Sequence, residues 1–101
     1  MKSLTKNINC YQITIEKLSG EGTGNSKTLQ FDIQDREDMF SIVDHLKKSS
    51  GLDNQSSTQL GVALRLLGPV MMGNRKHPLL IDFMPHFKNF MINLKKTLKN
   101  N

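Results

Sequence analysis

Apolar and polar residues alternate in two short segments near the start of the chain. Within residues 10–18, apolar and polar residues alternate from Tyr11 to Glu16, and the alternation holds throughout residues 28–34. The apolar positions are Tyr11, Ile13 and Ile15 in the first segment and Leu29, Phe31 and Ile33 in the second. A period of two is typical of a strand with one buried face. Residues 19–27 are rich in glycine and polar side chains, so we predict an antiparallel β-hairpin.

The glycines of this connection raise the alternative of a phosphate-binding loop. Gly20, Gly22 and Gly24 have no Cβ atom, which would let the backbone approach an anion as such a loop needs. A phosphate loop, however, points its backbone N–H groups at the anion from the start of a helix. Here the glycines lead into another strand, and the Gly-Lys-Ser/Thr ending is absent. We therefore interpret them as a flexible hairpin tip.

The pattern then changes to a helical period. Met39, Ile42, Val43 and Leu46 form one stripe, and Ser49-Ser50-Gly51 ends this first predicted helix. Asp35 is predicted as its N-cap, with Asp38 at the third position completing a pair similar to a capping box.

Residues 58–78 are the most apolar stretch of the chain and predict a central helix that stops after Gly73-Asn74 and before Pro78. Its stripe is wide because a second row of apolar residues lies beside the first, so the helix needs cover on two sides. The two rows are Leu60, Ala63, Leu64, Leu67 and Met71, and Val62, Leu66 and Val70. The remaining face carries Gly61, Arg65, Gly68 and Met72, and its two glycines would let another backbone come close. The alternative to a kinked core helix is a hinge or a groove for a partner. Pro69 lacks a backbone N–H, so we predict a kink or break near Gly68 and Pro69, with Ser56, Ser57 or Thr58 as the cap.

A last helix is predicted from Phe83, with Pro85 in its first turn. Its buried stripe is Phe83, Phe87, Phe90, Met91, Leu94 and Leu98. The predicted fold is α+β, an N-terminal β-hairpin followed by three helices (β-β-α-α-α). We expect one domain over residues 1–101, with an ordered core at about 10–98.

Charge is distributed unevenly along the chain. The net charge is +5, yet residues 1–64 contain seven basic and eight acidic residues. Residues 65–101 contain seven basic residues and only one acidic residue, Asp82. Such asymmetry can indicate an anionic partner, which could be nucleic acid, an acidic protein or a membrane surface.

The sequence contains no pattern that identifies catalysis, a metal site or a cofactor. His77 and His86 are nine residues apart across a proline, and Cys10 has no neighbour that would activate it. We therefore predict no catalytic residues, no metal and no cofactor, and an enzyme is the weaker expectation. A single cysteine, no apolar leader and no long apolar run favour a cytoplasmic protein without a membrane span.

Basic residues supply the candidate binding site. Arg65 and the cluster Arg75, Lys76 and His77 are candidates for holding an anion or a partner, because guanidinium groups bind carboxylate and phosphate in fork geometry. A candidate basic face follows the last helix and consists of Lys88, Lys95, Lys96 and Lys99. The alternative is that these cations only stabilise helix ends and stay solvated.

Three hypotheses of function follow. The first is a non-enzymatic protein-interaction module, and the partner includes a second copy paired through the hairpin edge. The second is binding of nucleic acid or another polyanion through the basic C-terminal third. The third is an enzyme acting on a small anionic substrate held by Arg75, which requires a pocket lined by titratable groups.

Several stretches, taken in order, resemble a family of small bacterial proteins known only as a domain of unknown function. They are Tyr11-x-Ile13-Thr14-Ile15-Glu16, Leu29-x-Phe31, Asp38-Met39-Phe40-x-Ile42-Val43, Leu64-x-Leu66-Leu67-Gly68-x-Val70-Met71, Asn74-Arg75-Lys76-x-Pro78 and Phe83-x-Pro85-x-Phe87-x-x-Phe90-Met91-x-x-Leu94-Lys95. The resemblance covers residues 11–96, and Asn74-Arg75-Lys76-x-Pro78 is its most specific part. It implies a bacterial, cytoplasmic, stand-alone domain and supplies no activity or ligand.

Overall fold

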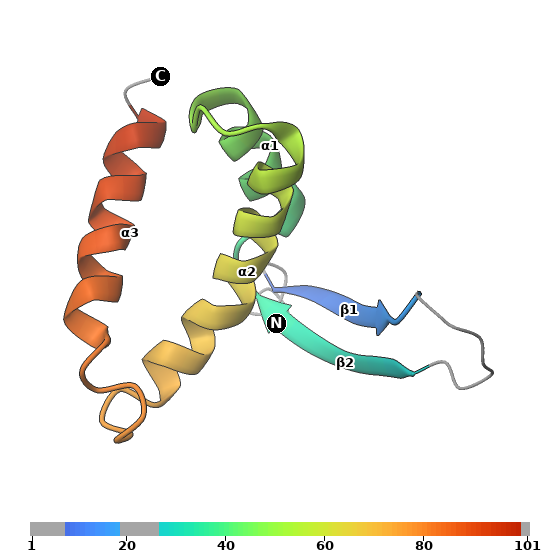
Figure 1. Cartoon of the computed structure of the whole chain (residues 1–101), viewed down its shortest axis with the longest axis horizontal. Coiled ribbons are helices and arrows are strands. Elements are labelled where there is room, and N and C mark those ends of the chain that lie inside the picture. The colour runs from blue at the N-terminus through green and yellow to red at the C-terminus, as the bar shows by residue number, and fades with distance from the viewer. Residues whose placement is uncertain (1–7, 19–26, 100–101) are drawn as a thin grey trace, which may run out of the picture. The chain divides into compact units, whose positions relative to one another are not determined.

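The hairpin forms as the alternation predicts. The computed structural model describes residues 8–18 and 27–99. Strands β1 (Asn9–Glu16) and β2 (Thr28–Asp35) pair antiparallel in a two-stranded sheet (Figure 1). The loop with Gly20, Gly22 and Gly24 lies outside the described residues, so its interpretation as a hairpin tip stays a prediction.

The register of the hairpin brings the apolar side chains together on one face. The directly opposed pairs are Tyr11 with Ile33, Ile13 with Phe31, and Ile15 with Leu29. Opposed apolar side chains are the units that stabilise a sheet.

Hydrogen bonds from β1 fix the backbone that leaves β2. The Asn9 amide nitrogen lies 3.3 Å from the carbonyl oxygens of Asp35, Arg36 and Glu37. The Tyr11 hydroxyl also donates to the Glu37 carbonyl, at 3.4 Å. The residues that follow β2 are thereby bound to the start of β1.

Three helices follow the hairpin. They are α1 (Met39–Ser49), α2 (Asn54–Gly73) and α3 (Met84–Lys99), which confirms the α+β order β-β-α-α-α (Figure 1). The chain divides into two compact units, a hairpin unit of Met1–Glu37 and a helical unit of Asp38–Asn101. The expectation of one domain stays a prediction.

The N-cap of α1 is Asp38, so the prediction of Asp35 was wrong. The Asp38 carboxylate accepts from the Phe40 N–H at 3.0 Å and from the Ser41 hydroxyl at 3.2 Å. Asp35 is instead the last residue of β2, where its buried carboxylate accepts from the Glu37 N–H at 3.0 Å. The end of α1 agrees with the prediction, because Gly51 adopts a φ of 86° shortly after Ser49.

Helix α2 begins earlier than its apolar pattern predicts. Asp53 is the N-cap, and its carboxylate accepts from the Ser56 N–H at 2.7 Å. Ser57 is fully buried, and its hydroxyl lies 3.3 Å from that of Ser50. The polar residues 54–57 thus form the first turn of the helix, so the prediction of Ser56, Ser57 or Thr58 as its cap was wrong.

Close packing joins α1 to the first half of α2. Gly61 is buried, and a Cβ placed there would lie 2.9 Å from Val43 Cγ2, 3.2 Å from Leu46 Cδ1 and 3.4 Å from Val43 Cα. Leu46 is itself fully buried. The missing side chain at Gly61 therefore lets the two helices approach, as predicted.

The second half of α2 contains Pro69 without a break in the helix. Its axis changes direction along its length (Figure 1), because Pro69 has no N–H to donate to the Arg65 carbonyl and its ring crowds the preceding turn. The helix ends at Gly73, and the side-chain amide of Asn74 donates to the Val70 carbonyl at 2.8 Å. The structure therefore has a bend in a continuous helix, which corresponds to the predicted kink and not to a break.

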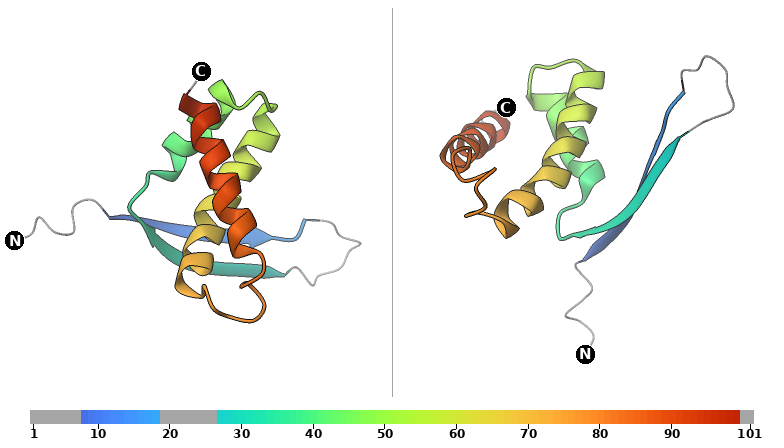
Figure 2. Two further views of the ribbon diagram at one scale, coloured as in Figure 1. Left: turned by 90° about the vertical axis from the view of Figure 1, so that its left-hand side faces the viewer. Right: turned by 60° about the horizontal axis from the view of Figure 1, so that its bottom comes forward.

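Large side chains join α2 to α3, which run in opposite directions (Figure 2). The buried cluster between them is Leu64, Met71, Met84 and Phe87, with Leu60, Leu80, Met91 and Leu94 packed against it. Phe83 and Phe90, predicted to be buried, remain 45% and 39% exposed, and Met84 takes the buried position. The stripe is therefore rotated slightly from the one predicted.

Candidate functional site

A groove of about 490 Å³ lies between α2 and α3. Both helices contribute a stretch of about two turns to its walls. The lining residues are Leu64, Arg65, Gly68, Pro69 and Met72 from α2, and Phe87, Lys88, Met91, Ile92 and Lys95 from α3. Its volume falls within the range of about 300–1,000 Å³ that is typical of ligand pockets.

The groove has an apolar floor and partly exposed apolar walls. Leu64 and Phe87 are buried, whereas Met72 and Ile92 are 49% and 53% exposed. A Cβ placed on Gly68 would meet no atom within 4 Å, so the space beside this residue is open. Exposed apolar side chains next to such a space are typical of a surface that a partner covers.

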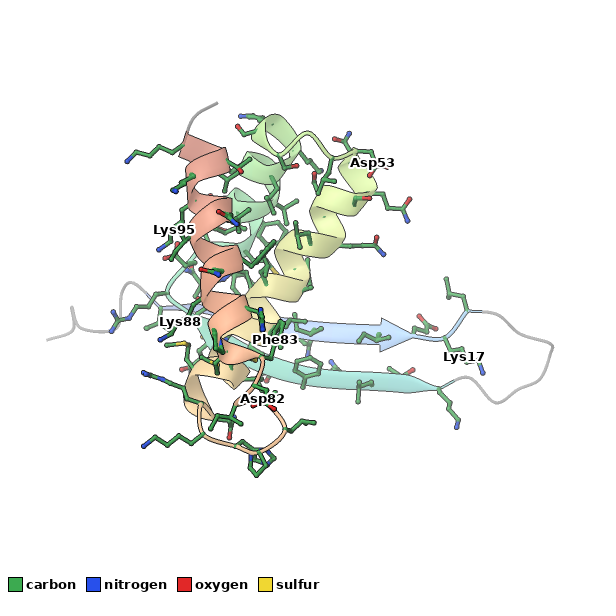
Figure 3. The ribbon with its side chains drawn as sticks, turned by 60° about the vertical axis from the view of Figure 1, so that its left-hand side comes forward. Lys17, Asp53, Asp82, Phe83, Lys88 and Lys95 are labelled. Atoms are coloured by element: carbon green, nitrogen blue, oxygen red, sulfur yellow. The ribbon has the colours of Figure 1, made fainter. Side chains whose placement is uncertain are left out.

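Three cations surround the groove. Arg65 lines it from α2, and Lys88 and Lys95 line it from α3. Figure 3 shows Lys88 and Lys95 on the same side of α3, as their separation of seven residues requires. None of the lining residues is acidic. The groove therefore combines an apolar interior with positive charge.

The structure divides the predicted basic residues into separate places. Arg65, Lys88 and Lys95 come together at the groove, whereas Lys96 and Lys99 are not among its lining residues. Arg75, Lys76 and His77 lie beyond the end of α2 in the connection to α3. The groove thus contains Arg65 from the first candidate group and Lys88 and Lys95 from the second. The other predicted basic residues lie elsewhere.

His77 has a structural task in this connection. Its Nδ1 accepts from the Leu79 N–H at 3.1 Å, and its carbonyl accepts from the N–H groups of Leu80 and Ile81 at 2.9 Å each. Its ring therefore stabilises the turn that leads to α3.

A second depression, of about 540 Å³, adjoins Arg75. It is lined by the consecutive residues Met72, Gly73, Asn74, Arg75, Lys76 and His77, all of them exposed. Its titratable groups are one guanidinium, one ammonium and one imidazole, and none of its lining residues is a carboxylate, serine or cysteine. This composition offers an anion a positive surface but contains no carboxylate, hydroxyl or thiol partner for the imidazole.

The apolar half of the groove was predicted only in part. Met72 was placed with Arg65 and Gly68 on the face of the central helix that could form a groove for a partner. Ile92 had no assigned role, and Phe87 and Met91 were predicted only as core residues. One signal was present in the sequence, because Lys88, Ile92 and Lys95 fall at helical spacing on one face. An apolar residue between two lysines on the outer side of a helix is such a signal.

The described part of the chain contains neither a metal-ligating cluster nor a membrane-spanning helix. Within residues 8–18 and 27–99, no three His, Cys, Asp or Glu side chains come together where they could hold a metal ion. None of the three described helices is long and apolar enough to cross a bilayer. The Cys10 thiol is free and exposed on β1.

The comparisons with known proteins agree on the kind of protein. A family model described as a domain of unknown function with a solved structure, DUF3861, matches residues 9–96. The chain is also similar to a crystal structure of a protein of unknown function from Pectobacterium atrosepticum. That protein is 35% identical, with a TM-score of 0.77 over 87% of this chain and 97% of the other. No curated protein matches the sequence. The chain therefore belongs to the DUF3861 family of domains of unknown function.

Proposed function

We propose that this protein is a non-enzymatic protein-interaction module and that the α2–α3 groove is its binding surface. The observation that carries the proposal is the exposure of Met72 and Ile92 on opposite walls of an apolar groove. An apolar centre bordered by polar or charged residues is the arrangement typical of protein interfaces, and here Arg65, Lys88 and Lys95 supply the charged border.

The methionines of the groove support the same proposal. Met72 and Met91 are unbranched and polarizable, so they can adapt their shape to a side chain that enters. The lining residues contain neither a histidine nor a carboxylate, which are the side chains that most often act as general acid or base.

Photo-crosslinking tests this proposal. A photoreactive residue is placed at Met72 in the groove or, as a control, at Ile81, which is 47% exposed and does not line the groove. In bacterial cells, we expect position 72 to crosslink to a defined protein that position 81 does not capture. The same products from both positions, or no product from position 72, would count against the groove.

A second candidate function is binding of nucleic acid or another polyanion. The gathering of Arg65, Lys88 and Lys95 around one groove favours it. Fluorescence anisotropy of labelled single- and double-stranded oligonucleotides would show micromolar binding that weakens steeply with salt. Equal affinity at low and near-physiological salt, or none at either, would remove this candidate.

We extend the proposal to the cellular location of the protein and to its oligomeric state. We place the protein in the bacterial cytoplasm, which is supported by its similarity to the Pectobacterium protein and by its single cysteine. We also propose that two copies pair through the hairpin, because each strand of the two-stranded sheet has an edge that can accept another strand. A strict monomer by light scattering at high concentration would exclude this dimer.

A further inference from the structure

We propose that the partner of the α2–α3 groove is an amphipathic α-helix whose apolar stripe is flanked by acidic side chains. This inference rests on the proposed function and specifies the chemistry of the partner. Three features of the groove lead to it: its length, the spacing of its lysines and the character of its floor.

The length of the groove fits a short helical segment. Its residues on α2 extend from Leu64 to Met72, and those on α3 extend from Phe87 to Lys95. Each stretch spans eight residue steps, or about 12 Å at the rise of an α-helix. About two turns of a partner helix would therefore lie along the groove, with side chains at i, i+3 and i+4 directed into it.

The spacing of the lysines fits acidic residues on such a helix. Lys88 and Lys95 lie about 10 Å apart along α3, because they are seven positions apart in the helix. Acidic residues seven apart on a helix running beside α3 repeat at the same distance. Each carboxylate would then meet one ammonium group, which selects the partner by charge.

The surrounding charge strengthens this selection. Neither α2 nor α3 contains an acidic residue, and Asp82 is the only one between Asn54 and Lys99. A partner helix with basic flanks would find no counter-charge on these two helices. The groove thus favours acidic flanks over basic ones on every wall.

The floor distinguishes a helix from nucleic acid. Proteins that bind single strands stack bases on accessible aromatic rings. Phe87 is the only aromatic residue that lines the groove, and it is buried to 6% exposure. The exposed apolar residues of the wall are Pro69, Met72 and Ile92, which favour aliphatic side chains rather than bases.

A peptide series tests the inference by titration calorimetry on the full chain. The probes are three synthetic helices of about 15 residues, a length at which helices begin to form alone. All three have the same leucine stripe, and their flanks are glutamate, glutamine or lysine. We expect the glutamate peptide to bind at least about tenfold more tightly than the lysine peptide, since two exposed charge pairs are gained or lost.

Charge-reversal variants locate the contact. Lys88→Glu/Lys95→Glu should weaken the glutamate peptide by about tenfold and strengthen the lysine peptide. Lys96→Glu/Lys99→Glu is the matched control, because it changes the net charge equally on the same helix outside the groove. Equal weakening by both double variants would overturn the inference, since it would indicate attraction to net charge alone.

Apolar variants separate this inference from the proposed function. Ile92→Asp in the groove should abolish binding of the glutamate peptide, whereas Ile81→Asp, at a similarly exposed residue outside it, should not. If all three peptides bind alike and Ile92→Asp still abolishes binding, the groove binds helices but the acidic partner is wrong. If no peptide binds while crosslinking from position 72 succeeds, the partner is not a helix.

Two other occupants would also overturn the inference. An oligonucleotide that displaces the glutamate peptide and whose binding is lost in Lys88→Glu/Lys95→Glu would make the groove a nucleic-acid site. A dimer of the wild-type chain that Ile92→Asp converts to a monomer would make the occupant a second copy.

Discussion

Helix α2 has two glycines seven residues apart, Gly61 and Gly68, and its two halves surround them differently. At Gly61 an added Cβ would lie 2.9 Å from Val43 Cγ2, whereas at Gly68 it would meet nothing within 4 Å. The first glycine allows α1 to pack closely against α2, and the second leaves the groove open toward α3. One residue type therefore serves packing in one half of the helix and an open surface in the other.

The conformation of the second half explains why a glycine is suited to position 68. A residue that precedes proline is disfavoured in the helical conformation, partly because its Cβ meets the proline ring. Gly68 has no Cβ, so Pro69 is tolerated within α2. The first half of α2 contains no proline and packs against α1 as in an ordinary pair of helices.

The largest effect that we predict is from Gly61→Leu. The side chain would overlap Val43 and the fully buried Leu46, so the free energy of unfolding should fall by about 3 kcal/mol. Urea denaturation measures this change. A loss below about 1 kcal/mol would show that α1 can move away from α2 at little cost, and the distinction between the two halves would fail.

Pro69→Ala should act in the opposite direction. It restores a backbone N–H for the Arg65 carbonyl within α2, so the free energy of unfolding should rise by about 1 kcal/mol. The straighter helix should also alter the groove and weaken the glutamate peptide. A variant that is more stable and binds the peptide unchanged would show that the bend has no part in binding.

Gly68→Leu is the matched counterpart of Gly61→Leu. The gain in helix propensity and the strain before Pro69 oppose each other, so the free energy of unfolding should change by less than about 1 kcal/mol. Because the new side chain would occupy open space beside the groove, peptide binding should be lost. Retained binding would place the partner elsewhere.

The smallest effect concerns the start of α2. The backbone hydrogen bond from Ser56, aided by its side chain, holds the pKa of Asp53 below its ordinary value of 3.8. Since the folded-state pKa is lowered, the stabilisation is present above pH 3.8 and is lost as the pH falls through the folded-state value. Asp53→Asn keeps a capping oxygen but does not titrate, so its unfolding free energy should depend less on pH in this acidic range. Identical pH profiles would show that this cap does not contribute.

The sequence predicted most of the fold because periodicity is a local property. The strands, the three helices and the contact at Gly61 follow from spacing, and Asn74 ends α2 where expected. The helix starts were misplaced because several residues could cap them. Asp35 and Asp38 both have suitable side chains, and only the extent of β2 decides between them.

The site was less predictable because it depends on contacts between helices. Lys88 and Lys95 were predicted as a basic face, but Arg65 joins them only when α3 folds back along α2. The same rotation of α3 that buries Met84 leaves Ile92 on the groove wall. A shift of one position in the buried stripe is too small for a hydrophobic pattern to resolve.

Tyr11, whose hydroxyl bonds to the Glu37 carbonyl, gives the molecule a natural optical reporter. It is the only tyrosine and the chain has no tryptophan, so ultraviolet emission reports on the hairpin unit alone. Far-ultraviolet circular dichroism, by contrast, is dominated by α1, α2 and α3. If the chain is one cooperative domain, the two signals change at the same temperature, and two separate transitions would mean that the hairpin melts by itself.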